Sequence, residues 1–396
     1  MENKRYMKRK LPRTVIILGL VSFLNDMASE MVTPFIPILI ATVLGAGPVI
    51  LGLVEGVADA AASFLKLWAG RHSDALGGKR KSLMVWGYGL SNLARPLISL
   101  ASSWGALLLL RSMDRIGKGI RTAPRDALLA DATDRDMHGY AFGFHRALDN
   151  AGAVGGSLLA VLALTWAGLT ISEVILWSAV PGVLVLLLLI FGVREPPRLA
   201  MPQESVLAPL AWSSLSPFTR RYLLVLILFT FARASEGFIL LRGNELGMSM
   251  VQILLLWATL SITKAATSTY GGRLADTFGL SRLTMTGWFG YGLSFLAISQ
   301  VSHIGWLWIS VIGYGLVTGL SEGSERALIS VYANEHERGT AFGWYHLAVG
   351  LSAIPAGLLF GTLWHYWGAG AAFLFAGSLA LVCVALLFLW HAPEKN

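Results

Sequence analysis

The chain has 396 residues, of which 55% are hydrophobic and only 14% are charged. An ordinary soluble domain carries roughly 25% charged residues, so this chain has too few polar side chains to cover a water-exposed surface. The same composition excludes a disordered chain and a coiled coil, and a single cysteine, Cys383, excludes a scaffold held by internal disulfides. We therefore predict a polytopic, all-α membrane protein.

The predicted membrane helices follow from length and hydropathy, because a helix needs about 20 mostly apolar residues to cross a bilayer. Twelve segments satisfy this rule, at residues 12–40, 49–69, 83–102, 105–130, 139–165, 171–193, 221–243, 251–271, 283–302, 305–331, 339–363 and 367–391. The first is not a secretory signal peptide, because its apolar stretch is too long and contains Asn25, Asp26 and Glu30.

The charge distribution predicts the orientation and the domain division. The net charge is +8, and basic residues gather in 4–13, 71–81 and 194–221, whereas 41–48 and 102–105 carry no charge. Cytoplasmic loops are enriched in Lys and Arg, so we expect a multi-pass protein of the cytoplasmic (inner) membrane with both termini in the cytoplasm. We attribute the positive charge to this enrichment and expect no nucleic-acid partner.

A proline-rich stretch divides the chain into two domains. Residues 194–220 form the longest predicted connection and contain five prolines. We predict an N-terminal six-helix bundle over 1–193, a cytoplasmic linker over 194–220 and a C-terminal six-helix bundle over 221–396.

The two halves repeat one another at offsets of 200 to 206 residues. The matched segments are GRHSDALG at 70–77 with GRLADTFG at 272–279, YGLS at 88–91 and 291–294, ASE at 28–30 and 234–236, and AFG at 141–143 and 341–343. Repeats that face each other across a site at the membrane midplane are the architecture of alternating-access transporters.

The arrangement resembles the major facilitator superfamily over essentially the whole chain. In that family the loop between the second and third helices carries glycines, an aspartate and basic residues. The residues that match this pattern are Gly70, Arg71, Asp74 and Gly77, followed by Lys79, Arg80 and Lys81. The position after the aspartate is usually basic and is Ala75 here, so we expect a weaker loop contact. Glycines allow close helix approach, and an aspartate can cap a neighbouring helix. The resemblance implies that these residues, with Asp276 in the second half, control the conformational change; the alternative is that they are only interfacial charges.

Two further helices carry parts of the family pattern. In the family the fourth helix has an arginine followed later by a proline, which Arg111 and Pro124 match. The stretch 114–128 is more charged than the general pattern and is similar to a bacterial subgroup. Many drug–proton antiporters have Gly-Pro and then paired glycines in the fifth helix; residues 151–156 keep the paired glycines without the proline.

Ionisable side chains inside membrane helices are costly and mark functional sites. The first helix carries Asp26 and Glu30, and the second carries Glu55 and Asp59, each pair one turn apart. The fourth helix carries three cations along one stripe, which are Arg111, Arg115 and Lys118.

Depth counting predicts how these charges meet. At about 1.5 Å per residue, Asp26, Asp59 and Arg115 lie near the midplane, and the other two acids and Arg111 lie about one turn further out. We expect two layers in which acids on the first and second helices face bases on the fourth. Four carboxylates against two or three cations leave a surplus acid, so all four acids are candidate proton-coupling groups. The alternative is a static ion-pair network that holds the N-terminal half together.

The remaining polar side chains give further candidates. Asp149 on the fifth helix, Arg233 and Glu236 on the seventh, and the three cations of the fourth helix are candidate cavity residues, with a structural role as the alternative. Glu322 and Glu325 on the tenth helix occupy the repeat positions of residues 122 and 125, so we predict gate pairs between the fourth and tenth helices. The histidines show no metal-ligand spacing and no Gly-rich nucleotide loop occurs, so we expect no metal site, cofactor or catalytic site.

These observations predict a secondary active transporter in which a central cavity opens alternately to each side. We expect a monomer in the lipid bilayer that moves a small-molecule solute by proton-coupled efflux. Uptake or export of an anionic or chelated solute is an alternative that the basic stripe favours, and uncoupled facilitated diffusion is another. A membrane enzyme or sensor is the alternative from a different class.

Overall fold

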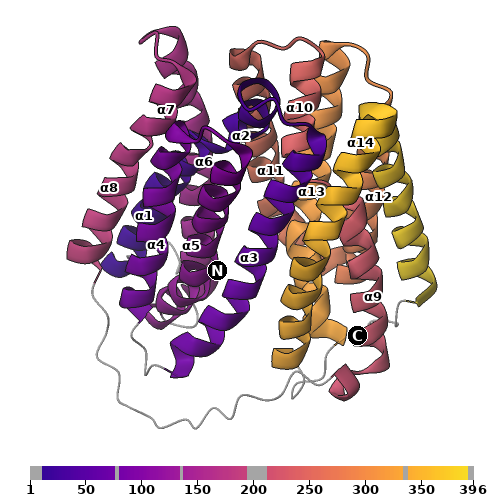
Figure 1. Ribbon diagram of the computed structural model, residues 1–396. Coiled ribbons are helices and arrows are strands. Elements are labelled where there is room, and N and C mark those ends of the chain that lie inside the picture. Colours follow the sequence, from indigo (N-terminus) through magenta and orange to yellow (C-terminus); the bar gives the residue numbers. More distant parts are fainter. Residues whose placement is uncertain (1–10, 76–79, 134–136, 194–211, 333–337, 391–396) are drawn as a thin grey trace.

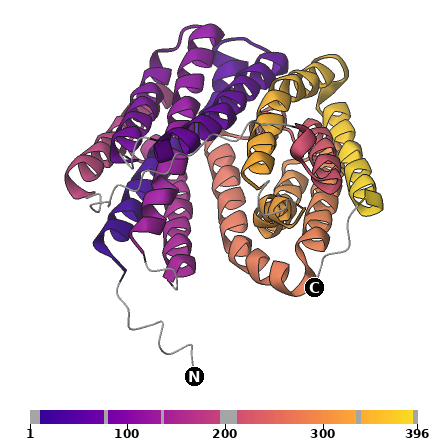
Figure 2. The same cartoon turned by 90° about the horizontal axis from the view of Figure 1, so that it is seen from below.

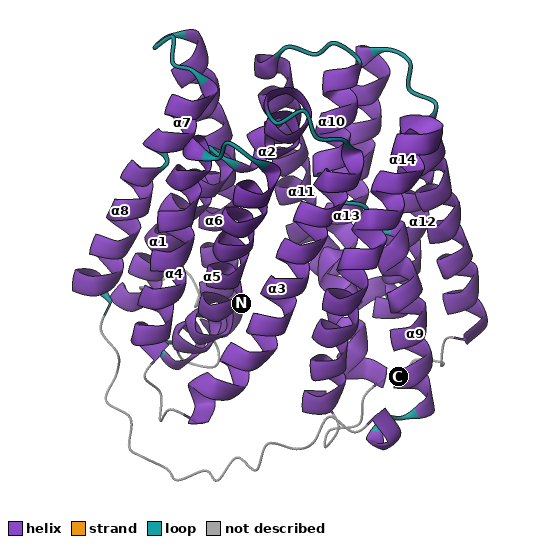
Figure 3. Ribbon diagram, viewed as in Figure 1, coloured by secondary structure: helices purple, strands orange, loops and turns teal. Residues whose placement is uncertain are grey.

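The computed structural model describes residues 11–75, 80–133, 137–193, 212–332 and 338–390, and these residues form helices and connecting turns without a strand (Figure 3). The helices form two groups that lie side by side (Figure 1). The first group contains α1 (Arg13–Glu30), α2 (Ile36–Ile38), α3 (Pro48–Ala75), α4 (Arg80–Leu97), α5 (Trp104–Asp131), α6 (His138–Thr165), α7 (Ile171–Trp177) and α8 (Ala179–Leu187). The second contains α9 (Pro217–Ala232), α10 (Gly237–Glu245), α11 (Met250–Phe278), α12 (Leu280–Ser299), α13 (Ile304–Tyr332) and α14 (Arg338–Trp390).

Eight helical segments among the described residues are long and apolar enough to cross a membrane. They are Arg13–Val43, Pro48–Ala69, Ala141–Thr165, Ile171–Gly192, Pro217–Glu245, Met250–Ser268, Ile304–Glu325 and Ala341–Trp390. The last of these turns at Gly368, where φ is 83°, so α14 consists of two helices joined at a kink. The chain is therefore a multi-pass helical membrane protein.

The first and seventh predicted helices are broken, which the hydropathy pattern does not indicate. α1 ends at Glu30, and the chain continues through a 3₁₀ turn, Thr33–Phe35, into α2. Pro34 and Pro37 lie in this region, and proline removes a backbone donor and clashes with the preceding helical turn.

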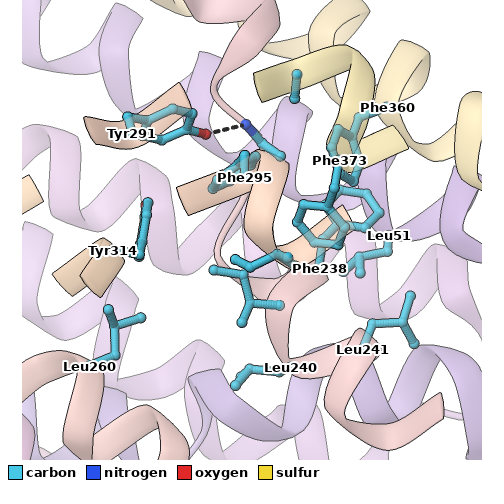
Figure 4. Packing of buried hydrophobic residues seen from close by; sticks show 14 of the residues in the cluster. Leu51, Phe238, Leu240, Leu241, Leu260, Tyr291, Phe295, Tyr314, Phe360 and Phe373 are labelled. Atoms are coloured by element: carbon cyan, nitrogen blue, oxygen red, sulfur yellow. Dashed lines mark hydrogen bonds between the residues drawn. The ribbon is translucent and has the colours of Figure 1, made fainter. Parts of the chain in front are cut away.

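The second break separates α9 from α10 and is stabilised by a tyrosine. Arg233 is extended, and the next helix begins at Gly237. The backbone N–H of Ala234 donates to the Tyr291 hydroxyl at 3.2 Å (Figure 4). That hydroxyl donates in turn to the carbonyl of Ala232, also at 3.2 Å. Backbone groups freed by a break need partners inside a membrane, and Tyr291 adds to the 3.1 Å bond that the Ala234 N–H makes to the Ala232 carbonyl.

The two groups of helices meet where glycines let backbones touch. α3 packs against α14, and α6 packs against α11. A Cβ on Gly52 would lie 1.9 Å from the carbonyl oxygen of Gly357, so only glycine permits this approach. The ribbons of the two groups diverge toward the end of the molecule at which α3 ends, at Ala75, and α9 begins, at Pro217 (Figures 1 and 2). Residues far apart in the sequence thereby line a shared interior.

The hydrophobic core of the second group is aromatic. Phe238, Phe295, Phe360 and Phe373 are almost fully buried and contact one another with ring centroids 4.5 to 5.2 Å apart (Figure 4). This cluster stands beside Tyr291 and packs α10 against α12 and α14.

Candidate functional site

A cavity of about 370 Å³ lies between the two groups of helices. α3 and α5 line one wall, and the α9–α10 break with α11, α13 and α14 lines the other. Its charged lining residues are Glu55, Asp59, Lys66, Arg111, Arg115, Arg233 and Glu236. Ligand sites in proteins are concave and contain a few convergent polar groups, so we take this central cavity as the candidate site.

One part of the first wall is a closed network of buried ion pairs. Arg111 binds Glu55 through Nε at 3.1 Å and Nη2 at 3.2 Å, and its Nη1 lies 3.5 Å from Asp114. Arg95 donates to Asp114 at 2.9 Å and to the backbone and side-chain oxygens of Asn25 at 3.0 and 3.1 Å. The predicted pairing of a second-helix acid with a fourth-helix base is therefore present for Glu55 and Arg111.

The network changes the charge balance inferred from the sequence. That count omitted Asp114 and Arg95, which are both about 2% exposed and belong to the same interior. Within the network two arginines face two carboxylates, so no surplus acid arises there. Glu55 serves as the bidentate partner of Arg111, which agrees with the static alternative for this residue.

Arg115, one turn along α5, has a different environment. It lines the central cavity and, within the described part of the chain, makes no hydrogen bond or ion pair; its Nε is buried without a partner. Asp59 also lines the cavity and is exposed, but it forms no ion pair with Arg115. The predicted Asp59–Arg115 layer therefore contains no direct ion pair among the described residues, although Asp59 and three other carboxylates, Glu55, Asp114 and Glu30, act electrostatically on Arg115. Lys118 is exposed on α5 and lines neither of the two cavities described here.

The acids of α1 do not pair with the bases of α5. Glu30 accepts a hydrogen bond from the indole Nε1 of Trp257, which lies on α11 in the other half. Asp26 accepts one from the side chain of Asn25 at 3.0 Å. Neither carboxylate has an ion-pair partner among the residues the structure covers. The closest contacts of these acids are therefore to Asn25 and Trp257 and not direct ion pairs, although Glu30 lies within electrostatic range of Arg115 and Lys118, and Asp26 within that of Lys118.

The second wall carries two ion pairs at the α9–α10 break. Glu236 binds the Lys264 ammonium group and accepts a hydrogen bond from the Tyr314 hydroxyl at 3.0 Å. Arg233 binds Glu325, which also accepts from Trp288 at 3.1 Å. These contacts hold both break residues at the cavity edge, where they were predicted to lie.

The gate prediction needs a correction for Glu325. We expected this residue to pair with the fourth helix, but its partner is Arg233 in the same bundle. The Tyr345 hydroxyl donates to Glu325 at 3.2 Å, so the carboxylate is enclosed by α9, α12 and α14. The cause is the α9–α10 break, which aims Arg233 at α13 and which the sequence does not reveal.

A smaller cavity of about 200 Å³ lies inside the second group of helices. It shares Arg233, Glu236 and Tyr314 with the central cavity. Its other lining residues are Phe229, Lys264, Gly287, Trp288, Tyr291, Thr318, Ser321, Glu325 and Tyr345.

Several predicted residues lie elsewhere. Asp149 is buried on α6, 3.7 Å from His145, and lines neither cavity described above. The side-chain surroundings of the predicted motif and gate residues other than Glu325 fall outside what the structure describes. These residues are Gly70, Arg71, Asp74, Gly77, Asp276 and Glu322. Arg80 of the basic run binds Asp131, and Lys81 donates to the carbonyls of Ile190 and Val193 at 2.7 and 2.8 Å. Among the described residues, no group of three His, Cys, Asp or Glu side chains is placed to hold a metal ion.

The sequence analysis missed three residues of the site. Asp114 bridges two arginines. The sequence could have indicated it, because it is an acidic residue within a basic stretch of a membrane helix. Trp257 and Tyr314 bind the glutamates of the repeated ASE segments. Aromatic residues are common in membrane helices, so nothing in the sequence alone singles these two out.

Comparisons with known proteins agree with this architecture. The family model described as Major Facilitator Superfamily matches residues 18–241 and 236–396. The chain belongs to the major facilitator superfamily. It is 34% identical over 389 residues to an uncharacterized MFS-type transporter, MJ1317, of Methanocaldococcus jannaschii, covering 96% of this chain and 95% of that protein. It is 25% identical to an uncharacterized protein of Mycobacterium tuberculosis, Rv2265, over 96% of this chain and 94% of the relative.

Solved superfamily structures share the fold at low sequence identity. The nucleoside transporter NupG matches 96% of this chain and 100% of its own, with a TM-score of 0.76 and 14% identity. The human organic anion transporter MFSD10 matches 95% of this chain and 99% of its own, with a TM-score of 0.67 and 19% identity. Membership of this superfamily and the multi-pass helical structure make the chain a membrane transporter of a small-molecule solute.

Proposed function

We propose that this transporter exports a small solute with an anionic group by alternating access, in exchange for protons. The single observation that carries the anionic solute is Arg115, which lines the central cavity without a direct hydrogen bond or ion pair in the described part of the chain, although carboxylates surround it. The guanidinium therefore keeps donors that an anionic group could use at membrane depth. Arg111, one turn away, is already neutralised by Glu55 and Asp114, so it does not compete for this role.

The proposal includes twelve membrane spans in two pseudo-symmetric bundles. The eight apolar segments become nine when α14 is divided at Gly368, and α4, α5 and α12 complete the set. We place the linker and both termini on the cytoplasmic side of the inner membrane, because the basic residues gather in these parts of the sequence. In this orientation the two bundles touch at the outer end and diverge toward the cytoplasm.

Three acids support the coupling to protons. Asp26, Glu30 and Asp59 lie in or near the interior and have no ion-pair partner among the described residues, whereas Glu55 has one. A carboxylate without a counter-ion inside a membrane is costly, and protonation removes its charge. We therefore assign the coupling role to these three acids and a structural role to Glu55.

The anionic solute is tested by ligand-induced stabilisation of the purified protein. A ligand that binds the folded state raises the melting temperature by mass action, so a panel of small carboxylates and sulfonates is screened at two pH values. Arg115→Ala should abolish the shifts produced by active anions. Arg221→Ala, which removes an exposed cation of α9 outside both cavities, is the control and should keep them. Shifts that survive in Arg115→Ala, or that arise only from cations, would contradict the anionic solute.

Proton coupling is tested in proteoliposomes with an anion that the screen identifies. Asp26→Asn, Glu30→Gln and Asp59→Asn each remove one ionisable group with little change in shape. At least one should abolish uptake driven by a pH gradient while counterflow exchange of the anion continues. If all three variants retain full pH-driven transport, the coupling group lies elsewhere.

A further inference from the structure

We propose that the 200 Å³ cavity inside the C-terminal bundle is a compartment for a planar aromatic ring, so that the transported solute is an aromatic anion. The anionic end of this solute rests on the proposed function above. The ring compartment rests on a separate set of residues in the other bundle. The two parts of the proposal are therefore tested separately.

The size and lining of the compartment fit a ring. In other proteins an apolar cavity of about 150 Å³ holds a benzene molecule, and this one measures about 200 Å³. Five of its lining residues are aromatic: Phe229, Trp288, Tyr291, Tyr314 and Tyr345. Aromatic rings pack against one another in stacked or edge-to-face geometries, and Phe229 and Trp288 already stack with centroids 3.9 Å apart.

The polar atoms of these aromatic residues are already bound within the protein. Tyr291 bonds the α9–α10 break, Tyr314 donates to Glu236, and Trp288 and Tyr345 donate to Glu325. Thr318 donates to the carbonyl of Tyr314 at 2.7 Å. The hydroxyl and indole groups are thus committed within the protein, and the aromatic lining offers a ligand ring mainly edges, because Phe229, Trp288 and Tyr291 already stack with neighbouring rings.

The charged side chains that line the compartment are paired with one another. Lys264 is paired with Glu236, and Arg233 with Glu325, so the lining is neutral as a whole. A charged ligand group would have to displace one of these pairs. The same residues at the mouth, Arg233, Glu236 and Tyr314, also line the central cavity that contains Arg115. Because the two cavities share these residues, the proposed solute would place its ring in one bundle and its anionic group toward the other.

The first measurement compares three probes by isothermal titration calorimetry on the protein in lipid nanodiscs. Naphthalene-2-carboxylate carries a planar ring and an anion, decahydronaphthalene-2-carboxylate has the same skeleton without planarity, and 2-naphthylmethylammonium reverses the charge. We expect the aromatic carboxylate to bind at least tenfold more tightly than either of the others. Equal binding of the saturated carboxylate would overturn the planar ring, and preferred binding of the ammonium compound would overturn the aromatic anion.

The second measurement places the ring in the compartment. Thr318→Phe fills the cavity, and Leu316→Phe, at a 41% exposed position on the same helix, adds the same ring outside it. Thr318→Phe should weaken naphthalene-2-carboxylate at least tenfold, and Leu316→Phe should not. Unchanged affinity in a folded Thr318→Phe protein would overturn the location. Arg115→Ala should weaken both carboxylates equally; if it weakens neither while Thr318→Phe still acts, the anionic end fails and the ring compartment stands.

A labelling experiment covers the case in which Thr318→Phe does not fold. Cys383 is the single cysteine, so Cys383→Ala with Thr318→Cys creates one thiol in the compartment. Naphthalene-2-carboxylate should slow its reaction with N-ethylmaleimide, and the decahydro analogue should not. Equal reaction rates with and without the aromatic carboxylate would overturn the proposal.

Discussion

Substitution of Gly52 by alanine should depopulate the conformation described here. The added Cβ would lie 1.9 Å from the Gly357 carbonyl oxygen, whereas ordinary contacts begin at 3.4 Å. The two helices must therefore separate locally by roughly 1.5 Å, and both obstructing groups are backbone. Overpacking costs about 1–3 kcal/mol, which changes a two-state population ratio by a factor of about 5 to 150. Because the α3–α14 contact joins the two bundles, the cost falls on this conformation and not on one in which the helices are apart.

The populations of the two conformations are obtained from the distribution of distances between two spin labels. The labels are placed at the end of the molecule where the bundles meet. Val43 and Trp367 are 63% and 68% exposed, and both are replaced by labelled cysteines in a Cys383→Ala background. Gly52→Ala should shift the distance distribution to longer values. Gly313→Ala is the control, because a Cβ there would meet nothing within 4 Å. A short-distance population that persists in Gly52→Ala, or that the control also loses, would refute the reasoning.

Three further predictions concern stability, measured as apparent melting temperature in detergent with exposed-site variants as controls. Arg111→Gln should destabilise the protein by about 3–5 kcal/mol, and Glu55→Gln in the same chain should restore part of the loss; additive losses would show that the pair is not coupled. Trp257→Phe removes the donor to Glu30 and should lower the free energy of unfolding by about 1–3 kcal/mol. An unchanged melting temperature would show that this hydrogen bond does not stabilise the protein. Tyr291→Phe should cost a similar amount by removing the hydroxyl's bonds to the Ala234 N–H and the Ala232 carbonyl, which then keep only their bond to each other, and full stability would mean that the hydroxyl does not hold the break.

Much of the fold was predictable because a membrane constrains helices strongly. Apolar length marks a span, and the repeat of GRHSDALG as GRLADTFG marks two related bundles. The breaks after Glu30 and Ala232 were not predictable in the same way, since the mean hydropathy across each of the two segments stays high, at 1.6 and 1.9. Prolines give a local reason for the first break. The second has no proline, and its stabilising Tyr291 lies 57 residues further along the chain.

The candidate site was predictable only as far as charge inside a helix identifies it. Glu55 and Arg111 were placed on facing helices by depth counting, and they form an ion pair. The partners of Asp26 and Glu30 were not, because a neighbouring amide and a distant indole carry no charge to count. Helical depth predicts which residues lie at one level, but side-chain direction decides which of them touch.

The two repeats place identical segments in equivalent positions and give them different chemistry. Both ASE segments lie beside a helix break, and their glutamates accept hydrogen bonds from aromatic donors. Glu236 also binds Lys264 within its own bundle, whereas Glu30 reaches across to Trp257 in the other bundle. The first contact is independent of the relation between the bundles. The second holds only while the bundles keep this arrangement, so a change at Glu30 acts on the balance between conformations and a change at Glu236 acts on the wall of the cavity.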